Sequence, residues 1–395
     1  MEKIKYASDE DIINISLPIS EKKSGIPFIF NGEKRVINNN YHTLAIADDD
    51  KQKYDKIINP LIEQISLSEE SFVISSNNRK IYEKYNSLLK DKGYNVICLD
   101  FDNPANFDSF NILELAYNLY KNNNQDKAIE IIENVGYYIF YDKETKNLDS
   151  FWINSAISLF IGIVLYSFDK EQKFELNKIR DLLDIIKIED IEKNTPMYNY
   201  LSGTFLAPNE TKGGIISVFN QKFNMIVTRE SLCKMLSNSN FDLKDITNKK
   251  QAIFMIEGTN NISKNLISLI INQIYYICNI YDNNNKINMI IDNFDELCPI
   301  KNVENIIYSF NNYNVILTTF IKSFTRMEKI YGDDGIPIIM TYFKNLLYLL
   351  SADLKTLEYI SELCGKPEYV SNLMNMKENE ALYIIIRTLP FIINI

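Results

Sequence analysis

The chain has 395 residues, a hydrophobic content of 46% and a formal net charge of −10. This length is enough for one large domain or two medium ones, each with its own core. The acidic charge does not indicate a dedicated nucleic-acid-binding protein, which usually has a basic face. Five scattered cysteines without metal-type spacing predict a reduced, cytoplasmic protein. A histidine-based triad or zinc cluster is nearly excluded, because His42 is the only histidine.

Short apolar runs rich in β-branched residues predict strands, and amphipathic patterns predict helices between them. The predicted strands cover residues 43–46, 71–76, 95–100, 252–256, 287–292, 314–319, 345–350 and 381–387. The predicted helices cover residues 55–67, 79–91, 263–282, 301–311, 322–331 and 354–364. This alternation predicts an α/β fold in which a mostly parallel sheet is covered by helices on both faces.

The alternation stops between about residues 111 and 245, where nearly all patterns are helical. We therefore predict a discontinuous α/β domain, residues 1–110 and 246–395, interrupted by an all-α insertion domain at 111–245. Two long apolar segments, 151–168 and 263–281, carry amides or hydroxyls within them. Polar side chains at mid-depth of a bilayer are costly, so we expect buried helices here and not membrane spans.

The connection between the first of these strands and its helix has the position of a phosphate-binding loop. Its sequence, Ala47 to Tyr54, aligns with the pattern G-x-x-x-x-G-K-[ST]. Lys53 has the lysine position, but Ala47 and Gln52 replace the two glycines, and Tyr54 replaces the small hydroxyl. The glycines normally let backbone N–H groups face a phosphate, and the hydroxyl holds Mg²⁺. The loop therefore has the wrong residues for holding a nucleotide.

Three consecutive aspartates, Asp48 to Asp50, also fill this loop. One like-charge contact with phosphate at about 4 Å costs on the order of 4 kcal/mol at an effective dielectric of 20. That cost is about half of the free energy of a micromolar affinity. We interpret the segment as an acidic turn that caps the following helix, with a working nucleotide site as the alternative.

Segments in unbroken order from about residue 5 to 390 resemble one known family. They are residues 6–10, 25–28, 42–44, 69–74, 92–97, 103–104, 110–111, 151–152, 289–294, 331–334 and 359–366. The family is that of the type IV secretion coupling proteins, the TraG/TraD-type ATPases of conjugation, and the Gram-positive branch is the most similar. The resemblance implies a RecA-like P-loop NTPase-type domain interrupted by an all-α domain.

The resemblance also shows where this chain departs from its relatives. It aligns Asp292 with an aspartate that orients the metal ion, but the catalytic glutamate that follows is replaced by Asn293, which cannot act as a base. We expect the nearby acidic pair, residues 295–296, to be a helix start or a surface pair. Relatives carry an arginine segment, a Q-S-x-x-Q-L segment and a DPKGE segment, which correspond here to residues 311–315, 322–327 and 76–80. None of the three stretches keeps the family's pattern.

Apolar and turn positions thus fit the family, whereas the polar positions that would contact ATP or metal differ. We predict no catalytic residue, no cofactor and no metal, with Lys53 and Asp292 as remnants of a nucleotide site. The predicted function is a pseudo-ATPase that docks a substrate or regulates an active coupling protein. The alternative is a divergent, active ATPase that moves DNA or protein through a type IV secretion channel, with ATP and Mg²⁺ as its ligands. A decayed relic of a mobile element also stays open.

The predicted partners are proteins: a coupling-protein homologue, a relaxase or a component of the secretion channel. The net charge does not indicate DNA binding, although a local DNA contact stays open, as does a ring oligomer. We expect a cytoplasmic location, with attachment to the inner face of the cell membrane through a partner as the alternative.

Overall fold

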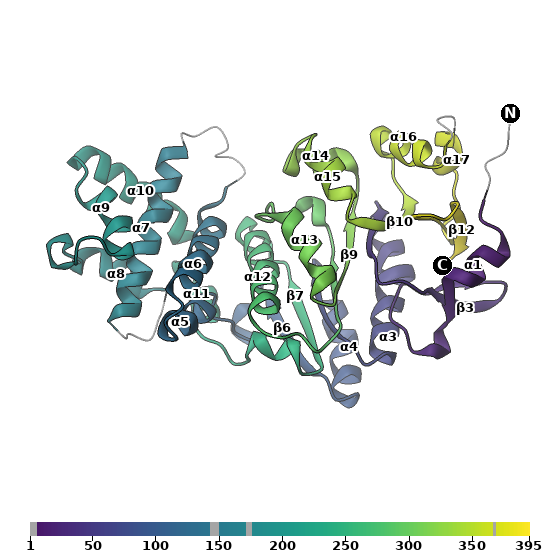
Figure 1. The fold of residues 1–395 in the computed structure, drawn as a ribbon, viewed down its shortest axis with the longest axis horizontal. Helices are drawn as coiled ribbons and strands as arrows, with labels where there is room; N and C mark the ends of the chain where they lie inside the picture. Colours follow the sequence, from purple (N-terminus) through teal and green to yellow (C-terminus); the bar gives the residue numbers. More distant parts are fainter. Residues whose placement is uncertain (1–5, 143–149, 171–175, 366–368) are drawn as a thin grey trace. The chain divides into compact units, whose positions relative to one another are not determined.

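A computed structural model describes residues 6–142, 150–170, 176–365 and 369–395 of the chain (Figure 1). The chain divides into two compact units. The first contains Met1–Cys98, Leu243–Ile256 and Tyr275–Ile395, and the second contains Leu99–Asp242 and Glu257–Ile274. We call them the sheet unit and the helical unit.

The described residues form a twelve-stranded sheet in the order β1-β3-β2-β12-β11-β10-β4-β9-β8-β5-β7-β6. Its strands are β1 (Ser16–Pro18), β2 (Phe28–Phe30), β3 (Glu33–Ile37), β4 (His42–Ala47), β5 (Ser71–Ser76), β6 (Asn95–Asp100), β7 (Gln251–Ile256), β8 (Ile287–Ile291), β9 (Val315–Ile321), β10 (Phe343–Leu350), β11 (Glu380–Ile385) and β12 (Phe391–Asn394). The strands β10, β4, β9, β8, β5 and β7 run parallel to their neighbours in this series. Every residue of β4, β5, β7 and β8 is buried, as expected for parallel strands covered on both faces.

All eight predicted strands are present, and the predicted α/β fold with a mostly parallel sheet is confirmed. Four strands were not predicted: β1, β2, β3 and β12. They extend the parallel part as an antiparallel series beyond β11. These strands have only three to five residues each, and such short segments give little periodic signal.

The sheet unit also contains helices. They are α1 (Asp9–Ile15), α2 (Asp50–Gln52), α3 (Asn59–Leu67), α4 (Lys80–Asp91), α13 (Val303–Asn312), α14 (Phe324–Tyr331), α15 (Gly335–Met340), α16 (Leu354–Leu363) and α17 (Val370–Met374). A π-helical segment, η2 (Lys53–Ile58), joins α2 to α3, so that the helix predicted to begin at residue 55 begins at Asp50. Single π-helical turns are rare and frequently occur at functional sites.

In the described part of residues 111–245, the secondary structure consists of helices. They are α5 (Glu114–Lys121), α6 (Gln125–Phe140), α7 (Ser150–Asp169), α8 (Lys178–Ile185), α9 (Pro196–Phe205), α10 (Asn209–Val227) and α11 (Glu230–Ser237), with the short 3₁₀ segments η5 (Ile188–Asp190) and η6 (Leu243–Thr247). The helical unit is larger than the predicted insertion, because it also takes in Leu99–Phe110 and the first part of α12 (Asn261–Ile280). Within it, Asn265 Nδ2 donates to the carbonyls of Tyr138 and Tyr141, which holds α12 against the end of α6.

Among the described residues, one helix, α7, is long and apolar enough to cross a membrane by length and composition. Within its most apolar window, 56% of the residues are buried inside the protein. Its Gly162 lies directly against Leu201 of α9, where an added Cβ would be 2.5 Å from the leucine Cγ. This packing is what a core helix shows, and an apolar helix of this kind is weak grounds for a membrane span.

Candidate functional site

The loop that follows β4 contains only two residues, Asp48 and Asp49, before α2 begins. Asp49 Oδ1 accepts a hydrogen bond of 2.8 Å from the backbone N–H of Gln52, so the predicted acidic cap is present. The N–H of Asp48 donates to the carbonyl of Leu350 in β10. A phosphate cradle needs several free N–H groups that face one point. In this loop the N–H groups of Asp48 and Gln52 already have acceptors within the protein.

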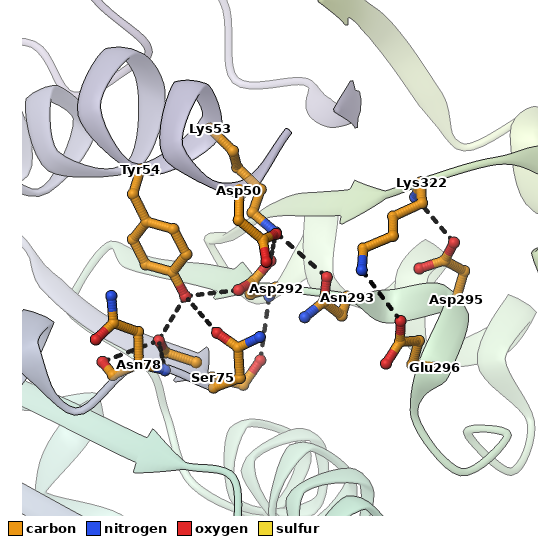
Figure 2. A network of polar contacts seen from close by, with 12 residues as sticks. Asp50, Lys53, Tyr54, Ser75, Asn78, Asp292, Asn293, Asp295, Glu296 and Lys322 are labelled. Carbon is orange, nitrogen blue, oxygen red and sulfur yellow. Dashed lines mark hydrogen bonds and ion pairs between the residues drawn. The ribbon is translucent and has the colours of Figure 1, made fainter. Parts of the chain in front are cut away.

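Lys53, at the first position of η2, has its ammonium inside the protein and not in an open loop (Figure 2). Its Nζ lies 2.6 Å from Asp292 Oδ1 and 2.7 Å from Asp50 Oδ1. It also donates to Asn293 Oδ1 at 3.2 Å. The contact with Asp292 is an ion pair without regular hydrogen-bond geometry. Burial by itself lowers the pKa of the Lys53 ammonium, but the charges of Asp292 and Asp50 outweigh burial and raise the pKa above its ordinary value.

Tyr54 contacts the carboxylate oxygen of Asp292 that Lys53 does not pair with. Its hydroxyl donates to Asp292 Oδ2 at 2.6 Å and lies 2.6 Å from Ser76 Oγ. Because the single phenol hydrogen goes to Asp292, the Ser76 hydroxyl donates to Tyr54. Burial, followed by the charge of Asp292, raises the pKa of the Tyr54 phenol far above its usual range. Tyr54 therefore stays neutral and holds the carboxylate of Asp292 as a hydrogen-bond donor.

The last two residues of β5 and the turn that follows complete this polar network. The hydroxyl of Ser75 accepts from the backbone N–H of Asp292 at 3.2 Å. Ser76 Oγ accepts from the N–H of Asn78 at 2.9 Å, which shapes the turn before α4. Ser76, the first residue of the stretch that we aligned with DPKGE, thus contacts Tyr54, and the preceding Ser75 contacts the residue that follows β8.

Asp292 and Asn293 follow β8 directly, as predicted, and both are buried. Asn293 has a left-handed backbone conformation, with φ 51°, which asparagine tolerates better than most residues. The prediction that residues 295–296 form a surface pair is wrong for Asp295. This side chain is buried, and its Oδ2 accepts from the backbone N–H groups of Lys322 and Ser323 at 2.8 and 3.3 Å. The helix-start part of the expectation is met by a short 3₁₀ turn, η7 (Phe294–Glu296).

Lys322 stands where relatives have a glutamine. Its Nζ lies 3.5 Å from Glu296 Oε1 (Figure 2). Arg326 contacts the same oxygen at 2.6 Å. Partial burial raises the pKa of Asp50, but the hydrogen bond and charge of Lys53, with a smaller contribution from Lys322, outweigh it and lower the pKa. The two lysines thus keep Asp50 ionised.

The described side chains do not fit ATP with Mg²⁺. The Lys53 ammonium already has three oxygen neighbours within the protein, two of them hydrogen-bonded and the third an ion-pair partner. Asp292 pairs one oxygen with the Lys53 ammonium and accepts a hydrogen bond from Tyr54 at the other, so a metal ion at this carboxylate would have to compete with both neighbours. Within the described parts of the chain, no group of three or more His, Cys, Asp or Glu residues could hold a metal ion.

Sequence reasoning placed Lys53 in the connection between a strand and a helix and Asp292 at the end of another strand, and the structure brings the two side chains together. It did not anticipate the roles of Asp50, Tyr54 and Asn293 as direct neighbours of this pair. For Tyr54 a signal existed, because a phenol in a buried position needs a polar partner. For Asp50, the spacing to Lys53 of three residues on a helix predicts a side-chain contact.

The parallel sheet, the strand-loop-helix unit that carries Lys53 and the aspartate that follows β8 define a RecA-like P-loop NTPase-type fold. Residues 65–379 match the family described as "Type IV secretory system Conjugative DNA transfer", and the chain belongs to this family. No curated protein sequence gives a match to this chain.

Solved structures show the same fold. The plasmid coupling protein TrwB, in complex with the GTP analogue GDPNP, is 13% identical, with a TM-score of 0.65 over 89% of this chain and 85% of that chain. The unbound monoclinic form of the conjugative coupling protein TrwBΔN70 is 12% identical, with a TM-score of 0.66 over 96% and 92%. VirB4 of Thermoanaerobacter pseudethanolicus is 11% identical, with a TM-score of 0.58 over 94% and 96%. At such identities the likeness concerns the fold alone.

Proposed function

We propose that this chain is a non-catalytic member of the conjugative DNA-transfer family, a pseudo-ATPase that docks a substrate or regulates an active coupling protein. One observation carries the proposal: protein oxygens enclose the Lys53 ammonium on three sides. Binding of a phosphate through this lysine requires that a buried ion pair first be broken, which costs several kcal/mol. In a working site the lysine is free to contact the β- and γ-phosphates.

Two further features support the absence of hydrolysis. Asn293 has no basic group that could activate water. Tyr54 fills the place of the small hydroxyl beside the metal, and its own hydroxyl is bonded to Asp292. Each feature removes a different requirement of ATP hydrolysis, so no single substitution would restore the reaction.

The alternative is a divergent, active ATPase that drives DNA or protein transfer through a type IV secretion channel. The observation in its favour is that the charged atoms of the two remnant residues, Lys53 at the start of η2 and Asp292 just after β8, lie 2.6 Å apart. This arrangement would serve ATP only if the lysine moved away from Asp292 and Asp50 on binding.

The proposed partners are proteins: an active coupling-protein homologue, a relaxase or a component of the secretion channel. A ring shared with an active homologue is one such assembly, in which this chain would be a silent subunit. We propose a cytoplasmic location, with contact to the inner face of the membrane through such a partner. The net charge of −10 offers no support for DNA as the main partner.

Calorimetry with Mg²⁺ and ATP tests the catalytic part of the proposal, with wild type and Lys53→Ala compared. We expect no binding heat at millimolar ATP. Binding that Lys53→Ala abolishes would overturn the proposal, and turnover would then be measured.

Co-purification tests the docking part. The chain is mixed with an active coupling protein, or with a relaxase, at low ionic strength, and retention on either supports a docking role. Failure to bind both under these conditions contradicts it.

A further inference from the structure

We propose that Asp50, Asp292 and Asn293 form a cation site that the chain fills with its own Lys53 ammonium. The inference rests on the proposed non-catalytic function and adds a structural task to it. In this interpretation Lys53 is not an unused remnant. Its ammonium supplies the positive charge that holds these three side chains together.

The three oxygen atoms come from separate places in the sheet unit. Asp50 begins α2, and Asp292 directly follows β8. Asn293 comes next in a left-handed conformation, with its side chain directed to the same centre (Figure 2). Their distances to Nζ are 2.7, 2.6 and 3.2 Å. Carboxylate and amide oxygens of this kind are the ligands that hard divalent cations take in proteins.

Burial explains why the centre needs a cation. The side chains of Lys53 and Asp292 are each 1% exposed, whereas that of Asp50 is 50% exposed. A buried carboxylate without a positive partner is strongly unfavourable. The hydrogen bond from Tyr54 satisfies one oxygen of Asp292 but does not neutralise its charge.

The charges of the centre indicate what could replace the ammonium. Two carboxylates surround one ammonium, so the cluster of Asp50, Asp292 and Lys53 carries a net charge of one negative unit. Removal of the ammonium leaves two carboxylates and an amide oxygen directed at one point, and one of these carboxylates, Asp50, is 50% exposed to solvent. A divalent cation there would balance both carboxylates.

One consequence is that the strand ends of this subunit are held together without a nucleotide or a metal ion. In the wild type the cation is covalently attached and cannot dissociate. The state of this site is therefore independent of the concentrations of ATP and Mg²⁺.

The test measures cation binding to full-length Lys53→Met without nucleotide, with Tb³⁺ as the luminescent probe and Ca²⁺ as the competitor. The Tyr54 ring lies 5.6 Å from Lys53 Nζ and is close enough to sensitise a bound Tb³⁺ ion. We expect a saturable luminescence that wild type lacks, its loss on addition of Ca²⁺, and a thermal midpoint that rises with Ca²⁺ only in the variant. Lys51→Met, two residues away and exposed, is the matched control and should behave as wild type.

Lys53→Met/Asp292→Asn decides whether the signal comes from this centre. The double variant removes both buried charges and should fold without binding Tb³⁺ above the wild-type level. Luminescence that persists in the double variant, or its absence in folded Lys53→Met, would overturn the inference. If Lys53→Met is unfolded in buffer, Ca²⁺ should refold it, and failure of Ca²⁺ to do so equally overturns the inference. ATP binding by wild type would refute the proposed function. The cation-binding measurement on Lys53→Met contains no nucleotide, so its outcome is separate from the outcome of the ATP calorimetry.

Discussion

Asp292→Asn is expected to lower the free energy of unfolding by about 3 kcal/mol, because it leaves the Lys53 ammonium buried with a weaker partner. The two side chains are each 1% exposed and their charged atoms lie 2.6 Å apart. Loss of one partner of a buried pair costs about 3–5 kcal/mol. The lower end applies here, because Asp50 still contacts Nζ at 2.7 Å and the new amide oxygen still accepts from Tyr54.

Urea denaturation at neutral pH measures this loss, provided that the free energy of unfolding falls with urea concentration at the same slope in both proteins. Asp55→Asn, a neighbouring exposed aspartate, is the control and should change stability little. A double-mutant cycle with Lys53→Met then measures the interaction free energy between Lys53 and Asp292. We expect the double variant to lose less stability than the two single variants lose together. If Asp292→Asn loses no more than the control, Lys53 is not held by Asp292 in solution, and the structural basis of the proposed function is refuted.

Three further results are expected. Burial lowers the pKa of His42 to about 4, so the unfolded chain binds the proton first, and stability should fall by about 3 kcal/mol as the pH drops from 6.5 to 4. His42→Gln should flatten this part of the urea-midpoint profile, and an unchanged profile would contradict the assignment. Gly162→Ala should cost about 1–3 kcal/mol by overpacking against Leu201, whereas Gly203→Ala, with no atom within 4 Å of the new Cβ, should stabilise by up to about 1 kcal/mol in the same urea assay. Tyr54→Phe should cost about 1–3 kcal/mol in thermal or urea unfolding, because Asp292 loses its hydrogen-bond donor, and a neutral result would mean that water replaces the phenol.

His42 shows how a prediction of position differs from one of environment. The sequence placed it at a strand start, and β4 does begin there. Its ring nitrogens contact two other elements: Nδ1 accepts from the N–H of Leu317, and Nε2–H donates to the carbonyl of Ile307. These contacts, which fix the neutral ring, involve residues that lie 275 and 265 positions away and could not be inferred from the local pattern.

The sequence by itself determined the eight long strands and the helical interruption, because strands buried on both faces are continuous apolar runs in any chain that folds this way. It also determined that the loop before Lys53 lacks glycines, since residue identity needs no coordinates. The short antiparallel strands, the burial of Asp295 and the assignment of the first part of α12 to the helical unit were decided by tertiary packing.

The same division applies to the site. The sequence singled out Lys53 and Asp292 as remnant nucleotide-site positions, but it could not say whether their side chains face a ligand or each other. Only the fold decided this, because Tyr54 and Asp292 are 238 residues apart in the chain and meet where the sheet places β9 between β4 and β8. Burial at that meeting point makes an unpaired charge too costly, and the lysine therefore pairs with the carboxylates of its own chain.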